Sequence, residues 1–143
     1  MPTESGRWRQ AALIALAMLA AAVAWWAAAR LPREKRLLAL GRSAYDHESW
    51  EAAADNAREA LKIDPSSSES VRLLARSLGR LGRDESALAL FGRLGRDNLE
   101  AEDDFLLARV LARRNQPAAA RAQLWKAHEK RSEERRVGKE CLE

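Results

Sequence analysis

Apolar and small side chains recur every three or four residues along most of this chain, and short polar turns interrupt them. The first such stretch begins at Glu34 and predicts a helix that ends near Asp46. A second stretch begins near Trp50 and ends at Asp64-Pro65, because proline cannot continue the helical hydrogen-bond ladder and disfavours helix in the residue before it. These residues therefore predict a pair of amphipathic helices with a short connection.

The same pattern returns twice more. Helices are expected on either side of a turn at residues 82–84 and again on either side of a turn at residues 115–117. Ala53 and Ala87 lie 87 − 53 = 34 residues apart, and Ala120 follows 120 − 87 = 33 residues later. This period predicts three repeats, at residues 34–67, 68–100 and 101–130. Helix pairs of this length bury their apolar faces only by stacking on neighbours, so we expect an all-α solenoid.

The repeats resemble the tetratricopeptide repeat (TPR) family. The first repeat matches it best, since Leu40-Gly41, Trp50, Ala53, Ala60 and Asp64-Pro65 fall on the positions of the family pattern, whereas Ala44 stands where an aromatic residue is expected. The second repeat lacks the closing Asp-Pro and has Gly95 there. This resemblance implies a scaffold that binds other proteins. The chaperone-type carboxylate clamp of some members is disfavoured, because apolar residues such as Leu38 and Leu73 replace its polar groups.

Residues 11–29, AALIALAMLAAAVAWWAAA, contain no charged side chain and are long enough as a helix to cross a hydrocarbon core of about 30 Å. Trp8, Trp25 and Trp26 lie near the ends, where indole rings favour the interface. We expect a single-pass membrane anchor after an amino-terminal tail, residues 1–10. The alternative is a cleavable signal peptide, since small residues at 22–24 and 27–29 offer cleavage patterns.

The orientation of this anchor stays open. Arg7 and Arg9 precede it, and more basic residues follow it, so counting favours a cytoplasmic repeat domain. A short basic leader before one apolar span is also how many exported bacterial anchors begin, which leaves export as the alternative.

Composition adds little to this interpretation. The formal net charge of +4 is small and both signs alternate along the helices, as on an ordinary solvated surface. His47 and His128 have no partner at helical metal-ligand spacing, and no phosphate-binding glycine loop appears. We expect no enzyme activity, no cofactor, no metal, no nucleic-acid partner and no small-molecule substrate.

The repeat register predicts a basic groove along the first helices of the three pairs. Its members are six arginines: Arg42, Arg72, Arg76, Arg80, Arg109 and Arg113. Guanidinium groups bind carboxylates in bidentate geometry, so an acidic peptide or a chain terminus is the expected ligand. The alternative is that these arginines pair with neighbouring acids such as Glu69 and Glu102, or are merely solvated.

The segment RSEERRVGKEC, residues 131–141, resembles the translation of a common sequencing-adapter oligonucleotide. We therefore expect residues 131–143 to be a non-native tail and the natural chain to continue after Lys130. The sequence predicts a membrane-anchored scaffold for protein binding. Its alternatives are a secreted or periplasmic repeat protein released by signal cleavage, or the adaptor segment of a longer enzyme or assembly factor.

Overall fold

The computed structural model describes residues 33–140 and, before them, residues 16, 18, 19 and 25. Every regular element in these ranges is a helix. A helical segment covers residues 33–46, and it is followed by α2 (Trp50–Ile63), α3 (Ser68–Arg80), α4 (Asp84–Leu94), the 3₁₀ turn η1 (Arg96–Asn98), α5 (Ala101–Arg113) and α6 (Pro117–Glu140). The expected all-α fold is confirmed for this part of the chain.

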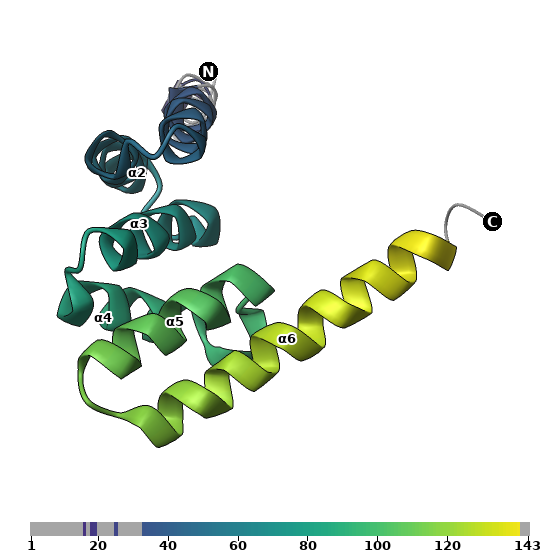
Figure 1. Ribbon diagram of the computed structural model, residues 1–143. Coiled ribbons are helices and arrows are strands. Elements are labelled where there is room, and N and C mark those ends of the chain that lie inside the picture. Colours follow the sequence, from purple (N-terminus) through teal and green to yellow (C-terminus); the bar gives the residue numbers. More distant parts are fainter. Residues whose placement is uncertain (1–15, 17, 20–24, 26–32, 141–143) are drawn as a thin grey trace, which may run out of the picture.

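The helices follow one another as antiparallel pairs that stack in chain order (Figure 1). α3 packs against α2 and α4, while α5 packs against α3, α4 and α6. This arrangement of helix pairs is consistent with the expected α-solenoid. The last helix differs from the prediction, because α6 continues to Glu140 whereas the third repeat was expected to end at residue 130.

The turn inside each pair has the same geometry. One residue adopts a left-handed conformation, with φ of 59° at Glu48, 75° at Gly82 and 58° at Asn115. The next residue's amide then donates to the carbonyl five positions earlier, from Ser49 to Ala44 at 2.9 Å and from Arg83 to Leu78 at 2.9 Å. Gln116 donates to Leu111 at 3.0 Å in the same way. Such bonds satisfy carbonyl groups at a helix end, so the 34- and 33-residue spacings recur in the backbone itself.

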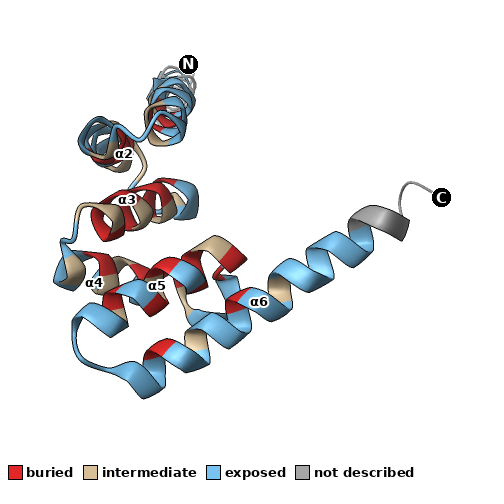
Figure 2. Ribbon diagram, viewed as in Figure 1, coloured by how far each residue is buried: buried red, intermediate tan, exposed pale blue. Residues whose placement is uncertain are grey.

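Small residues allow these helices to approach closely. Ala53, Ala87 and Ala120 are buried, with exposed fractions of 0%, 0% and 5%. A Cβ placed on Gly41 would lie 2.7 Å from Leu73 Cδ2 of α3, so an alanine there would displace that side chain. Figure 2 shows the buried residues concentrated along α3 and the faces turned toward it, whereas the later part of α6 is exposed.

The predicted end of the second helix agrees with the structure. α2 ends at Ile63 before Asp64-Pro65, and Ser67 caps α3 by accepting from the Ser70 amide at 3.3 Å. The short turn η1 was not expected. It lies between α4 and α5, where Gly95 has a φ of 79°.

The expected membrane span, residues 11–29, lies outside the described residues apart from Leu16, Met18, Leu19 and Trp25. Among the helices that the structure describes, none has the length and apolar character needed to cross a membrane.

Candidate functional site

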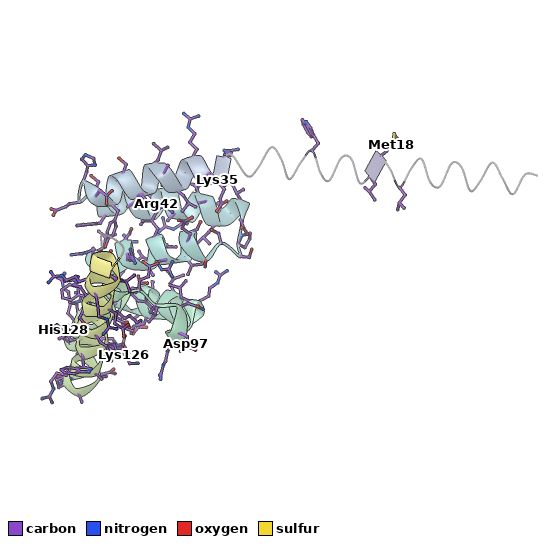
Figure 3. All side chains as sticks on the ribbon, turned by 90° about the vertical axis from the view of Figure 1, so that its right-hand side faces the viewer. Met18, Lys35, Arg42, Asp97, Lys126 and His128 are labelled. Atoms are coloured by element: carbon purple, nitrogen blue, oxygen red, sulfur yellow. The ribbon has the colours of Figure 1, made fainter. Side chains whose placement is uncertain are left out.

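The first helices of the pairs carry all six arginines predicted to line the groove. Arg42 lies on the segment 33–46, Arg72, Arg76 and Arg80 lie on α3, and Arg109 and Arg113 lie on α5. Figure 3 shows Arg42 on its helix with Lys35 nearer the start of the same helix. Three of the six meet at one hollow of about 190 Å³, lined by Arg42, Tyr45, Glu69, Arg72, Leu73, Arg76 and Glu100. Residues from the first two predicted repeats therefore line a common site, with Glu100 at the N-cap of α5.

A buried carboxylate organises two of these arginines. Asp103, in the first turn of α5, is 0% exposed. Its Oδ2 accepts from Arg72 Nε at 3.0 Å and its Oδ1 from Arg76 Nε at 2.6 Å. Asp103 Oδ2 also accepts from the backbone amide of Glu100 at 2.9 Å. Three donors and the positive end of the helix dipole thus stabilise the carboxylate without water.

The outer nitrogens of the same two guanidiniums contact an exposed acid, Glu100, and a partly buried one, Glu102. Glu100 contacts Arg72 Nη1 at 3.1 Å and Arg76 Nη2 at 2.7 Å. Arg76 Nη1 donates to Glu102 at 2.9 Å. Burial lowers the pKa of Arg76, but its bonds to Asp103, Glu102 and Glu100 outweigh this effect and raise the pKa overall. Arg76 therefore remains charged in its half-buried position.

Arg80 belongs to an aromatic cluster beside the hollow. Its Nε donates to the Tyr45 hydroxyl at 3.3 Å, and its guanidinium carbon lies 5.2 Å from the centre of the Trp50 ring. The Tyr45 hydroxyl in turn donates to Glu102 at 2.8 Å. Burial, together with Glu102, raises the pKa of Tyr45 to about 12, although Arg80 opposes this rise. The cluster ties the first helix pair to the third through α3.

The remaining predicted arginines differ from one another. Arg42 pairs with Glu69, and both side chains are half exposed. Arg113 pairs with Asp84 at 2.5 Å and donates to the Gly79 carbonyl at 2.9 Å, so it joins α5 to α4 and α3 rather than lining the hollow. The Arg113 guanidinium holds the pKa of Asp84 below its usual range. Arg109 is exposed and forms no ion pair with another described residue.

Five of the six arginines thus pair with a carboxylate of the chain: Arg42, Arg72, Arg76, Arg80 and Arg113. Pairing with neighbouring acids was the alternative to a free basic groove. Replacing Arg72 and Arg76 by glutamate would set new carboxylates against buried Asp103. We therefore expect such a variant to lose stability, because the like charges would meet in a buried contact.

The sequence interpretation missed Asp103, Asp104 and Lys130 as structural partners. Both aspartates lie in the first turn of α5, and both are buried. Asp104 is 1% exposed and accepts from Lys130 of α6 at 2.6 Å, while Lys130 also donates to the Leu99 carbonyl. Both aspartates lie near arginine or lysine only after the helices have packed, so linear spacing carried no signal for them.

Comparison with known proteins adds no family to this picture. No protein-family profile matches the chain, and no curated protein matches it. Within the ranges that the structure describes, no group of three or more His, Cys, Asp or Glu side chains is arranged to hold a metal ion. The functional proposal therefore rests on the geometry of the groove.

Proposed function

We propose that the chain is a membrane-anchored scaffold of TPR-like repeats that binds acidic peptide segments in the hollow beside Arg42, Arg72 and Arg76. The observation that supports this most directly is that the two α3 arginines, Arg72 and Arg76, each bind a buried carboxylate and an exposed one. Asp103 accepts from both Nε atoms, and one outer nitrogen of each guanidinium, Arg72 Nη1 and Arg76 Nη2, contacts Glu100, whose side chain is 55% exposed. The other outer nitrogens donate to the Asn98 carbonyl and to Glu102.

A ligand carboxylate can take the place of Glu100. Glu100 is 55% exposed, so solvent screens its side of these ion pairs, although its partners Arg72 and Arg76 are only 20% and 16% exposed. An incoming acid therefore competes with Glu100 for the two guanidiniums. The buried contacts to Asp103 hold the two guanidiniums in a fixed orientation, which lowers the entropic cost of binding a planar carboxylate. Arg42 offers a further cation at the rim, where its partner Glu69 is 52% exposed. The hollow is thus a pre-oriented but exchangeable carboxylate site.

The test is a titration of the full chain with a fluorescent peptide that carries clustered carboxylates, at low and moderate salt. Glu100→Gln should tighten binding, because it removes the competing charge and keeps the side-chain shape. Arg42→Glu should weaken it, and both effects should shrink with added salt. Glu59→Gln provides a matched control, since Glu59 is exposed on α2 and pairs with Lys62. Unchanged affinity in both groove variants would refute the peptide site.

The anchor is proposed from residues 11–29, whose length and uncharged composition suit a bilayer. Carbonate extraction of membranes from expressing cells should leave the full-length chain in the pellet. Recovery in the soluble fraction would refute the anchor. Amino-terminal sequencing of that fraction would then show whether the segment had been cleaved, as the signal-peptide alternative requires.

A further inference from the structure

The first turn of the segment 33–46 presents only positive charge to solvent. Arg33, Lys35 and Arg36 are exposed, and none of them forms an ion pair with another residue of the range 33–140. Figure 3 shows Lys35 at the edge of the stack where this helix begins, whereas Lys126 and His128 lie toward the opposite edge. Three cations therefore surround the start of the repeat domain.

The acid between these cations lies on the other side of the helix. Glu34 is 7% exposed, and it precedes Gly41 by 41 − 34 = 7 residues, which places both on one helix face. Gly41 faces α2 and α3, since a Cβ there would lie 3.2 Å from Asn56 Cβ and would also meet Leu73. Packing thus turns the one carboxylate of this turn inward and leaves the basic side chains outside.

Acids of the neighbouring elements do not neutralise these cations. Those at the end of α2 and the start of α3 have partners of their own: Glu59 pairs with Lys62 at 2.5 Å, Asp64 accepts from the Ser66 hydroxyl at 2.6 Å, and Glu69 pairs with Arg42. Residues 1–32 contain one acid, Glu4, and three arginines. The three cations are therefore available to an external anion.

Their position in the chain favours lipid headgroups as that anion. They follow Ala29, the last residue of the proposed span, by four to seven residues. At the helical rise of about 1.5 Å per residue this is about 6–10 Å, which matches a headgroup layer of about 5–8 Å with side chains that reach back toward it. The anchor holds lipid beside these residues permanently, whereas a soluble acidic partner must first be recruited.

We infer that Arg33, Lys35 and Arg36 bind the phosphate groups of anionic lipids and hold the first helix of the repeat domain at the membrane surface. This inference rests on the proposed anchor and specifies the lipid class that the anchored domain contacts. Each cation near an anionic surface favours binding by about fivefold. The three residues are not part of the peptide hollow, so the two proposals can fail or succeed separately.

The experiment reconstitutes the full chain, with Trp8→Phe, into vesicles of equal parts phosphatidylglycerol and phosphatidylcholine. Bromine is carried by the acyl chains of phosphatidylglycerol in one preparation and by those of phosphatidylcholine in the other, so both bilayers have the same surface charge. Bromine quenches tryptophan only at short range, and Trp26 precedes Arg33 by 33 − 26 = 7 residues. Stronger quenching by brominated phosphatidylglycerol should correspond to a preference of roughly fivefold or more for this lipid.

Charge removal tests whether the three cations cause this preference. The triple variant Arg33→Gln, Lys35→Gln, Arg36→Gln should lose most of it. The control variant Arg83→Gln, Arg121→Gln, Lys126→Gln removes three exposed charges elsewhere and should keep it. In the original protein the preference should shrink at about 1 M salt, where the Debye length is about 3 Å.

Two results would overturn the headgroup contact: equal quenching by both lipids in the original protein, or the same loss of preference in both triple variants. Carbonate extraction of the same vesicles separates this failure from failure of the anchor. Release of the chain would overturn the anchor and the inference together, whereas a retained chain with equal quenching overturns the headgroup contact alone.

Discussion

Replacement of Asp103 by asparagine should substantially destabilise the repeat domain. Asp103→Asn keeps the volume of the side chain but removes the charge that faces Arg72 Nε and Arg76 Nε. The amide has one acceptor oxygen, so at most one guanidinium keeps a strong bond and the other meets an NH₂ donor. The two arginines, 20% and 16% exposed, cannot turn fully into solvent.

The magnitude follows from these contacts. A hydrogen bond to a charged group contributes about 1.5–3 kcal/mol, and breaking a buried pair costs about 3–5 kcal/mol. Glu100 and Glu102 still hold the outer nitrogens, which limits the loss to about 2–3 kcal/mol. For a domain of this size each kcal/mol corresponds to about 4–8 °C, so the melting temperature should fall on the order of 10–20 °C.

Thermal unfolding followed by circular dichroism at 222 nm measures the effect in the full chain. Asp97→Asn is the control with the same chemical change, since Asp97 is exposed in η1 and has no ion pair with another described residue. The control should stay within about 0.5 kcal/mol of the original protein. A fall in Asp103→Asn no larger than in the control would refute the assignment of Asp103 as the buried centre of the network.

Three other perturbations test the fold. Ala53→Arg should cost more than about 3 kcal/mol, because it forces a long charged side chain into a contact that is 0% exposed; Ala52→Arg, on the exposed side of the same helix, should be nearly neutral in the same melting assay. Glu48→Gly should raise the free energy of unfolding by about 0.5–1 kcal/mol, since glycine adopts the positive φ at no steric cost, and a loss of stability would contradict this. Tyr45 is the only tyrosine in the chain, so absorbance at 295 nm should report a pKa of about 12 in the folded state. Because this pKa lies above the unfolded value of about 10, the folded state retains the tyrosine proton to higher pH. The contribution of Tyr45 to stability is therefore complete below pH 10 and is lost as the pH rises to about 12. A titration near pH 10 would place Tyr45 outside the cluster.

The sequence determined the helices and their order. The helices end and restart because of local backbone chemistry, which does not depend on distant residues. The residues that act in this way are Pro65, Gly82 and Asn115-Gln116-Pro117. The regular spacing of Ala53, Ala87 and Ala120 indicated the stacking, because a small residue at the same position of each repeat allows a neighbouring helix to approach closely. Glu48 gave no such signal, although it takes the left-handed turn position that glycine and asparagine occupy in the other pairs.

The sequence also placed the six arginines on the first helices, but it did not determine which of them remain available. Pairing depends on which carboxylates the neighbouring helix brings within reach, and the partners of Arg72 and Arg76 are 24 to 31 residues away in the chain. Two arginines at equivalent positions, Arg76 and Arg109, therefore have opposite surroundings. One is held by three acids at a helix junction, and the other lies on a face that no described helix covers. Local periodicity decides where a side chain lies along its helix, whereas only the packing of helix on helix decides whether its charge is satisfied.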